Sequence, residues 1–464
     1  MDFKGKNFYI IGLGDKGTGR ETAKLLLSEG AFVTISDTKS VEELRHSIDG
    51  ILVFGDCVFK CGEKAYEDIE KADTIIVSPG VPSFIPPLIK ARALNIPIIS
   101  EVELAYRLLK APIIAITGTK GKTTTTTLAG LIAKKCHKHD VFVGGNIGVP
   151  LVSVAKTAKE EDLIVAELSS FQLENIINFH PHVAVFTNLY EDHLDRYNNS
   201  IEEYFQAKLK IFQNQTEDDF AIVNTDLEIS QRVIAATRAK IIPVSLNEKV
   251  LGGIYLEKNA IMSSIGSMPE HIIDTEQIRI KGQHNLANVM CAIATTLAIN
   301  LPVANCIGEV LAEFKGVENR LEEVATINGI SFYNDSQGTT PMAVEMALNS
   351  FAEKSVVLIA GGRAKVSNFD ELGSAIAKKS KSAILIGEAK EVIANAILKF
   401  APNFHLEYAD TLPDAVTRAY SHHAKSGDNI VLSPACASFD MFKNMEERGK
   451  IFKETVAKIA EGIT

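Results

Sequence analysis

The sequence predicts an α/β protein of about three domains. Short apolar runs that end in Gly, Ser, Asp or Asn alternate with helical patterns almost throughout the chain, as in NFYIIGLG, IIAITG, LIVAELSS, SVVLIAGG and NIVLSPA. Such runs are typical of strands buried on both faces of parallel sheets. The chain has 464 residues, which fits three domains at roughly 150 residues each. Ligand sites are therefore expected beyond the carboxyl ends of the strands.

Composition excludes several classes of protein. The hydrophobic fraction of 46% and charged fraction of 23% are those of a globular chain, not a disordered one. The formal net charge of -10 argues against a general binder of nucleic acid or anionic membranes. The six cysteines form no CxxC pair, so neither a structural zinc site nor a disulfide framework is indicated. The N-terminus lacks a signal-peptide pattern, and no run reaches the roughly 20 apolar residues of a membrane span, so a cytoplasmic protein is expected.

The first glycine-rich segment, Gly12-Leu13-Gly14-Asp15-Lys16-Gly17, follows an apolar strand and precedes a helix expected over 18–29. A second strand ends at Asp37, 20 residues after Gly17. This pattern is typical of a dinucleotide site, where backbone N–H groups approach a pyrophosphate and an acid binds a ribose hydroxyl. A nicotinamide cofactor, another phosphate ligand and a simple tight turn all remain open for this segment.

The second glycine-rich segment, TGTKGKT at 117–123, lies between the strand 113–116 and a helix expected over 124–135. In a P-loop, backbone N–H groups cradle phosphates, the lysine reaches the terminal phosphates and the hydroxyl binds Mg²⁺. Lys122 and Thr123 suit these roles, although Ile116 stands where the usual spacing has a glycine. The competing interpretation is a Gly/Lys turn before a Thr-rich helix.

Two further strand ends carry metal-ligand side chains. Glu167 ends the strand 163–166, where a carboxylate could hold Mg²⁺ beside the phosphates. Glu191, Asp192 and His193 follow another strand. For that tripeptide alone, an acidic first helical turn with a solvated histidine is the favoured interpretation.

Two domain boundaries are predicted. One lies near residue 110, where a helix expected over 101–110 gives way to Ala111-Pro112, and the other lies near 314–316. The domains are then 1–109, 110–315 and 316–464. A less regular region, from about 224 to 283, is expected to form short antiparallel strands beside the main sheet.

The order of motifs resembles the Mur ligase family over essentially the whole chain. The motifs are TGTKGKTT, GGNIG (144–148), ELSSFQLE (167–174), NLYEDHLDRY (188–197), AKLKIF (207–212), GQHNLAN (282–288), NRLE (319–322), NDSQGTTP (334–341) and SPACASFDMFKN (433–444). The resemblance implies a Rossmann-like N-terminal domain for a UDP-sugar, a central P-loop ATPase domain and a Rossmann-like C-terminal domain. It also implies that the first glycine-rich segment holds UDP instead of NAD.

The resemblance further implies roles for individual residues. The expected ATP contacts are Gly118, Thr119, Lys120, Gly121, Lys122, Thr123, Thr124, Asn285, Asn288, Arg320 and Asp335. The expected contacts to the UDP substrate are Gly14, Asp15, Lys16, Gly17, Asp37, Thr38, Gly80, Asn146 and His193. The expected amino-acid contacts are Thr339, Lys365, Ser438, Phe439 and Met445. Thr123, Glu167, His193 and a carbamylated Lys208 would bind two Mg²⁺ ions, for which Mn²⁺ could substitute, and Lys122, Lys208 and His193 would be the catalytic set.

The activity implied is ATP-dependent amide ligation that adds D-glutamate to a UDP-linked muramoyl-alanine through an acyl phosphate, in cytoplasmic peptidoglycan synthesis. Gln337 and Met445 stand where the family often has a lysine and an aromatic residue, so the identity of the amino acid stays open. The alternatives are a related Mur- or folylpolyglutamate-type ligase, a non-catalytic UDP-sugar-binding protein and, least favoured, an NAD dehydrogenase. The expected partners are small-molecule substrates only, with no nucleic acid or membrane insertion, and the chain is expected to be monomeric.

Overall fold

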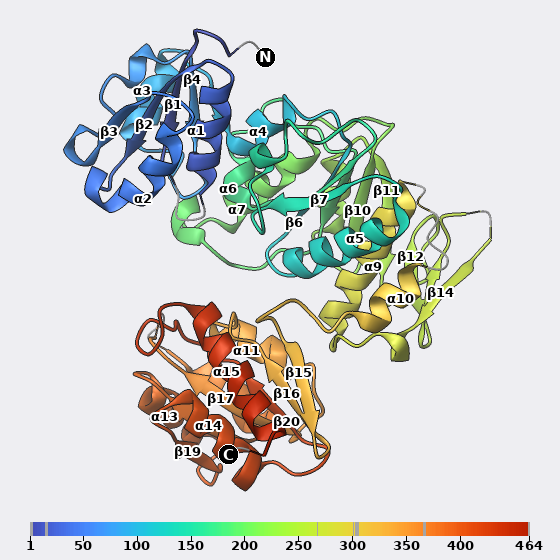
Figure 1. Cartoon of the computed structure of the whole chain (residues 1–464). Helices are drawn as coiled ribbons and strands as arrows, with labels where there is room; N and C mark the ends of the chain where they lie inside the picture. The colour runs from blue at the N-terminus through green and yellow to red at the C-terminus, as the bar shows by residue number, and fades with distance from the viewer. Residues whose placement is uncertain are drawn as a thin grey trace. The chain divides into compact units, whose positions relative to one another are not determined.

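A computed structural model of the chain describes residues 3–13, 17–266, 268–299, 301, 306–364 and 368–462. The chain forms two compact units, Met1–Thr275 with Ala287–Val310 and Glu276–Leu286 with Leu311–Thr464 (Figure 1). The first unit holds two sheets and the second holds one.

The N-terminal sheet has five parallel strands in the order β3-β2-β1-β4-β5. The strands are β1 (Asn7–Ile11), β2 (Phe32–Asp37), β3 (Val58–Cys61), β4 (Thr74–Val77) and β5 (Ile98–Ser100), and the helices are α1 (Thr18–Ser28), α2 (Val41–Leu52) and α3 (Pro86–Ala93). The strand order reverses beside β1, because β2 lies on one side of it and β4 on the other. In such sheets ligands bind beyond the carboxyl ends of the strands at this reversal.

The central sheet has nine strands in the order β14-β13-β12-β11-β10-β9-β6-β8-β7. The strands are β6 (Ile113–Thr117), β7 (Val141–Gly145), β8 (Leu163–Glu167), β9 (Val183–Phe186), β10 (Phe220–Asn224), β11 (Lys240–Ser245), β12 (Ile254–Glu257), β13 (Ala260–Ser263) and β14 (Glu270–Asp274). The helices are α4 (Glu101–Tyr106), α5 (Lys122–Cys136), α6 (Ser170–Leu173), α7 (Ile201–Leu209), α8 (Ser230–Ala235), α9 (Gln283–Ala298) and α10 (Cys306–Glu313). Strand β6 is fully buried between β8 and β9, which places the segment after Thr117 at the centre of the sheet.

The C-terminal sheet has six strands in the order β15-β16-β20-β17-β18-β19, parallel except for β15. The strands are β15 (Glu322–Ile327), β16 (Ile330–Asn334), β17 (Val356–Gly361), β18 (Ser380–Ile386), β19 (Leu406–Tyr408) and β20 (Asn429–Leu432). The helices are α11 (Pro341–Leu348), α12 (Asp370–Lys379), α13 (Lys390–Phe400), α14 (Leu412–Arg418) and α15 (Met445–Ala460), with a π-helical turn, η7, over Ala419–His423. The sheet separates two apolar cores.

Most of the expected elements form, with two differences. The helix expected over 101–110 ends at Tyr106, because the chain then turns to bring β6 into the central sheet, and Pro112 disfavours helix at Ala111. The strands expected beside the main sheet form part of that sheet, and one of their pairings is parallel. β12 pairs in parallel with β11, and β13 and β14 extend the central sheet in antiparallel pairing. Among the described helices, none is long and apolar enough to cross a membrane.

Candidate active site

The first glycine-rich segment packs closely around the end of β1. A Cβ at Gly19, in the first turn of α1, would lie 2.3 Å from the carbonyl oxygen of Gly12. Gly17 has a φ of 78°, a left-handed conformation that favours glycine. Gly14, Asp15 and Lys16 lie outside the described residues. Close approach of the helix to the strand therefore requires glycine at Gly19, and the left-handed turn before the helix favours glycine at Gly17.

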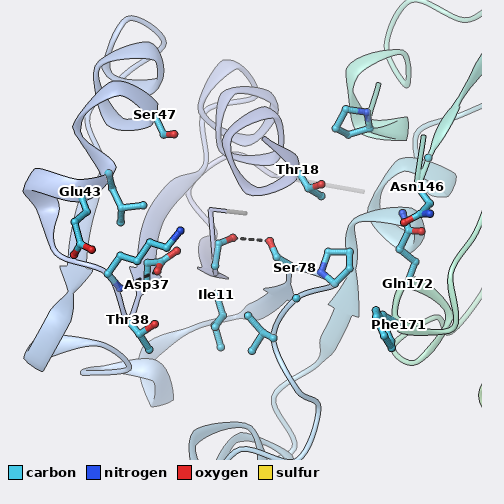
Figure 2. Close-up of a pocket in the computed structure, with 18 of the residues that line it drawn as sticks. Ile11, Thr18, Asp37, Thr38, Glu43, Ser47, Ser78, Asn146, Phe171 and Gln172 are labelled. Carbon is cyan, nitrogen blue, oxygen red and sulfur yellow. Dashed lines mark hydrogen bonds between the residues drawn. The ribbon is translucent and has the colours of Figure 1, made fainter. Parts of the chain in front are cut away.

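Asp37 lies at the carboxyl end of β2 and faces this segment. Its carboxylate accepts the backbone N–H of Leu13 at 2.9 Å and of Lys39 at 3.0 Å. On the other side of β1, Ser78 donates its hydroxyl to the carbonyl of Gly12 at 2.5 Å (Figure 2). The ends of β1, β2 and β4 are thus held together by side chains that follow each strand.

A pocket of about 640 Å³ opens beside these strand ends. Figure 2 shows Asp37 and Thr38 on one side of it and Asn146, Phe171 and Gln172 on the other. Gly80 also lines the pocket. The pocket therefore joins residues of the N-terminal sheet to residues that follow β7 and β8 of the central sheet, all within the first unit.

Asn146 connects this pocket to a buried carboxylate. Its side-chain amide donates to Glu167 Oε1 at 2.6 Å, and its backbone N–H donates to the carbonyl of Glu167 at 2.8 Å. Glu167 is 1% exposed, and its second oxygen, Oε2, is buried with no hydrogen-bond partner among the described residues. An unpartnered buried carboxylate oxygen is costly unless a cation or donor satisfies it.

The second glycine-rich segment forms a compact loop between β6 and α5. Gly118 has a φ of 142°, and a Cβ there would lie 2.0 Å from Thr187 Oγ1. Gly121 has a φ of 80°, and a Cβ there would lie 2.2 Å from Asn288 Oδ1. The loop thus lies against the end of β9 and against α9, so larger residues do not fit at either glycine. Thr123 and Thr124 are in the first turn of α5, whose free backbone N–H groups favour anions.

Two lysine side chains converge on one carbonyl of this loop. Lys122 Nζ donates to the carbonyls of Gly118 at 3.1 Å and Thr119 at 2.9 Å, and Lys208 Nζ donates to Gly118 at 2.7 Å. Lys208 lies on α7 and is 1% exposed. Its burial, together with the nearby charge of Lys122, holds the pKa of Lys208 well below the usual range for a lysine. Burial therefore disfavours the protonated form of this amine.

The acidic segment after β9 lies against the same loop. Asp192 Oδ2 is 3.1 Å from Lys120 Nζ. Burial favours the neutral form of Asp192, but the charges of Lys120 and His193 outweigh it and lower its pKa. The His193 ring is exposed and packs edge-on against Phe171, with ring centroids 5.1 Å apart. His193 thus lies next to a residue of the pocket, and its backbone is left-handed with a φ of 54°.

The remaining expected ATP contacts lie on α9 and in the second unit. Asn288, three residues after Asn285 on α9, is the residue that faces Gly121, and Asn285 donates to the carbonyl of Lys281 at 2.8 Å. In the second unit, Asp335 follows β16 and accepts the hydroxyl of Ser433 at 2.6 Å. Burial raises the pKa of Asp335 to about 7. Arg320 precedes Leu321, whose backbone N–H donates to Asp335 at 3.2 Å.

The expected amino-acid contacts belong to the second unit. Thr339 follows Asp335 on the same loop, and Ser438 is 3% exposed while its neighbour Phe439 is 64% exposed. Met445 begins α15, and its carbonyl accepts the hydroxyl of Ser336 at 2.7 Å. Lys365 lies outside the described residues. Arg363, which precedes it, pairs with Glu388 at 3.0 Å.

Four further residues support these sites and were not singled out from the sequence. Asn188 accepts the backbone N–H of Lys120 at 2.8 Å and so shapes the phosphate loop. Arg196 and Glu174 form an ion pair that borders the pocket, with Nε 2.8 Å from Oε1. Arg448, 1% exposed, donates to the carbonyls of Ser336 and Cys436, and its burial lowers its pKa to about 10. The motifs that carry Asn188, Glu174 and Arg196 were visible in the sequence, but their partners lie too far along the chain to be inferred from it.

Comparison with known proteins agrees with this arrangement. Family models match in the same order as the three sheets: "Mur ligase MurD-like, N-terminal domain" at 6–100, "Mur ligase middle domain" at 116–296 and "Mur ligase, glutamate ligase domain" at 319–436. A relative from Caldicellulosiruptor bescii, named UDP-N-acetylmuramoylalanine--D-glutamate ligase, is 41% identical over 99% of both chains. The chain belongs to the Mur ligase family.

Other members extend the comparison. Proteins of the same name from Geotalea uraniireducens and Clostridioides difficile are each 41% identical, over 100% and 98% of this chain and 99% of theirs. A UDP-N-acetylmuramate-alanine ligase structure from Thermotoga maritima covers 98% of this chain and 100% of its own, with a TM-score of 0.60 and 18% identity. That structure shares the fold. Membership of the Mur ligase family confirms the three-domain α/β fold expected from the sequence, and it implies the use of ATP.

Proposed function

We propose that this protein is an ATP-dependent ligase that joins D-glutamate to UDP-N-acetylmuramoyl-L-alanine, in the nucleotide-linked, cytoplasmic steps of peptidoglycan synthesis. The observation that carries the proposal is full-length similarity to ligases of that name together with a P-loop and a separate UDP-sized pocket in one unit. A dehydrogenase would leave the P-loop without a role. A non-catalytic binder would not need Lys122, Glu167 and Lys208.

The proposed substrate orientation follows from the pocket. UDP would lie at the β1–β2 end, where Asp37, Thr38 and Gly80 line the cavity. The segment 14–17 is proposed to contact UDP as well. The sugar-peptide end would extend toward Asn146 and His193, because these residues lie on the side of the central sheet. This direction brings the terminal carboxylate of alanine toward the P-loop, where the γ-phosphate of ATP is proposed to bind.

The ATP site is proposed to use residues 118–124, with Asn288 and Asn285 on the adenine side. Lys122 would release its two loop carbonyls and pair with the phosphates, since charge-assisted bonds to phosphate are stronger than bonds between an amine and a neutral carbonyl. Arg320 and Asp335 are proposed to contact phosphate and ribose. Thr339, Lys365, Ser438, Phe439 and Met445 are proposed to hold the incoming amino acid.

The proposed reaction has two steps. A carboxylate oxygen of the substrate attacks the γ-phosphorus of ATP, the bond to ADP breaks, and an acyl phosphate forms. The amine of D-glutamate then attacks the acyl carbon, and the tetrahedral intermediate loses phosphate and a proton to give the amide. Lys122 stabilises charge on the transferred phosphoryl group, and Asn146 orients Glu167. Because the reactants are anions, holding them in contact is the main task of the site.

Divalent metal fits this site. The Oε2 atom of Glu167 is buried with no hydrogen-bond partner among the described residues, and Thr123 offers a hydroxyl from the first turn of α5. Glu167, Thr123, His193 and carbamylated Lys208 would hold Mg²⁺, or Mn²⁺ in its place. Bound metal would neutralise phosphate charge.

Carbamylation of Lys208 is proposed because burial disfavours the protonated form of its amine. The neutral amine attacks CO₂ and releases one proton, which leaves a carbamate with two ligand oxygens. This converts a neutral amine into an anion that can bind Mg²⁺.

The test measures phosphate release with ATP, Mg²⁺ and UDP-N-acetylmuramoyl-L-alanine, with D-glutamate and L-glutamate in parallel. Turnover with D-glutamate and little with L-glutamate is expected. A clear preference for L-glutamate or for another amino acid would favour the related-ligase alternative. Absence of turnover with any amino acid, by protein that still binds the UDP substrate, would overturn the proposal in favour of a binding protein.

A further inference from the structure

Three metal-ligand side chains meet at one edge of the C-terminal sheet. His405 immediately precedes β19, Glu407 is the middle residue of β19, and His423 is the last residue of the π-helical turn η7. Leu406 packs into the apolar core on one face of the sheet and Ala409 into the core on the other. Since side chains alternate along a strand, His405 and Glu407 point to the Ala409 face, which α14 and η7 also cover.

The buried imidazole of His423 is incompletely hydrogen-bonded by the described residues. Its side chain is 0% exposed, yet neither ring nitrogen has an aligned hydrogen bond among the described residues. Nε2 lies 3.3 Å from Glu407 Oε1, and the His405 ring stacks on it with centroids 4.5 Å apart. Burying a polar group in this way is unfavourable unless something completes its bonding. Burial also lowers the pKa of His423, which favours the neutral, metal-binding imidazole.

We propose that His405, Glu407 and His423 form a binding site for one Zn²⁺ ion. One ligand atom from each residue lies within 4.8 Å of the others. Two ligands of a tetrahedral zinc ion are roughly 3.4 Å apart, which matches the 3.3 Å between His423 and Glu407. The exposed His405 ring then needs only a side-chain rotation to bring its nitrogen closer, and water can supply a fourth ligand.

The chemistry of the ligands selects the metal. Two imidazole nitrogens and one carboxylate suit zinc and related transition metals, whereas Mg²⁺ prefers oxygen ligands and water. The nearby positive charge is Arg418 of α14, 3.9 Å from the other oxygen of Glu407. Asp414 pairs with Arg418 at 2.9 Å and so reduces the repulsion that the guanidinium would exert on a cation.

The site is separate from the proposed ligase chemistry. Within this unit, Asp335 and Ser433 follow the carboxyl ends of β16 and β20, whereas His423 precedes the amino end of β20. A bound ion would join a three-residue edge strand to the turn that leads into the centre of the sheet. Its effect would therefore be structural, stabilising an edge that is otherwise held by few strand hydrogen bonds.

The test uses the full-length protein, freed of metal by a chelator and then kept in excess Mg²⁺ to occupy the ligase site. Zn²⁺ is titrated by calorimetry, and Co²⁺ is added as a spectroscopic probe of tetrahedral nitrogen and oxygen ligands. One Zn²⁺ per chain and a zinc-dependent rise in the unfolding temperature are expected. His405→Gln and His423→Gln should each weaken zinc binding more than about 100-fold.

The matched control is His271→Gln, because His271 is an exposed histidine that pairs with Asp274 at 2.9 Å. It should keep the full zinc stoichiometry. His405 is exposed, so its variant keeps the test valid even if His423→Gln does not fold. Zinc binding that is absent in the wild type, or equal in the wild type and His405→Gln, would overturn the proposal. Phosphate release by His405→Gln in Mg²⁺ should match the wild type, so failure of the zinc site and failure of the ligase assignment are distinguishable.

Discussion

Arg196 and Glu174 form a two-point ion pair that also links the first two sheets. Arg196 Nε and Nη2 each donate to a Glu174 oxygen at 2.8 Å, and the guanidinium also donates to the carbonyls of Pro79 at 2.8 Å and Val81 at 2.9 Å. The two side chains are only 11% and 9% exposed. One arginine of the central region therefore holds the segment after β4 that forms one wall of the pocket.

Replacing Arg196 by methionine should both destabilise the protein and weaken binding of the UDP substrate. Removal of one partner leaves the Glu174 charge buried, which costs about 3 kcal/mol for a buried pair. Chemical denaturation should show this loss, and the KM for the UDP substrate should rise more than the KM for ATP. Arg232→Met is the control, because the Arg232–Glu202 pair is about half exposed, and it should cost much less stability than Arg196→Met. Equal effects of the two variants would contradict the linking role.

Lys122→Ala should abolish phosphate release while leaving UDP-substrate binding nearly unchanged. The lysine donates to the carbonyls of Gly118 and Thr119 in the P-loop, and the UDP pocket is lined by other residues. A loss of at least about 10³-fold in kcat is expected for removal of a cation from a phosphoryl-transfer site. Lys134→Ala, an exposed position on the same helix, should retain activity. Loss of phosphate release and UDP-substrate binding together would show that the two sites are not separable in this way.

Lys208 should carry a carbamate at neutral pH. NMR of protein equilibrated with ¹³C-bicarbonate should show a carbamate signal in the wild type that is absent in Lys208→Arg, whose guanidinium does not react with CO₂. The control is Lys210→Arg, two residues away and half-buried, which should keep the signal. A signal that persists in Lys208→Arg would assign the carbamate elsewhere, and no signal in the wild type would remove it from the mechanism.

The sequence predicts what is local and misses what is distant. Asp37 and Glu167 each end an apolar strand and the P-loop follows one, so the alternation of strands and helices predicts that each lies at the carboxyl end of a strand, as it does in the structure. The Arg196 contacts to Pro79 and Val81 join residues more than a hundred positions apart. No periodicity records such a contact, because it depends on how two sheets pack.

The cluster of His405, Glu407 and His423 could not be predicted from the sequence either, because it also depends on how distant segments pack. His405 and His423 belong to no short metal-binding motif, and only the π-helical turn and the edge position of β19 bring them together. The shortened α4 is similar, since its end at Tyr106 is decided by entry of β6 into the central sheet and not by the residues of the helix. The domain boundaries near 110 and 315 stay predictions.

Gly19→Ala should destabilise the N-terminal sheet. The new Cβ would lie 2.3 Å from the Gly12 carbonyl and 2.7 Å from Leu13 Cα, both backbone atoms that cannot move without shifting β1 or α1. Overpacking of this kind costs about 1–3 kcal/mol, and UDP-substrate affinity should fall with it. Gly50→Ala in α2 is the control, since its nearest neighbour would be Arg20 Cδ at 3.9 Å, and it should be neutral or slightly stabilising. Chemical denaturation measures the free energy of unfolding of both variants. An unchanged value for Gly19→Ala would mean that α1 can shift to make room for the new Cβ.

Glu101 should make stability depend on pH. Its carboxyl group is 1% exposed, Oε1 accepts the N–H of Val152 at 2.7 Å, and Oε2 has no partner among the described residues. Burial raises its pKa from 4.5 to about 7. The folded state therefore binds the proton more tightly than the unfolded state, so stability falls as pH rises from the unfolded pKa and stops falling above the folded pKa. The total loss of stability between the unfolded and the folded pKa is about 3 kcal/mol.

Glu101→Gln removes this titration and keeps an oxygen for the Val152 N–H. The stability of the variant relative to the wild type should therefore increase between about pH 5 and pH 7 and stay constant at higher pH. Chemical denaturation at pH 5, 6, 7 and 8 measures the difference, in which the other titrating groups cancel. Glu160→Gln, at an exposed position, is the control and should show a difference that does not change with pH. A constant difference for Glu101→Gln would mean that water reaches Oε2, because a hydrated carboxylate has no reason to hold its proton at neutral pH.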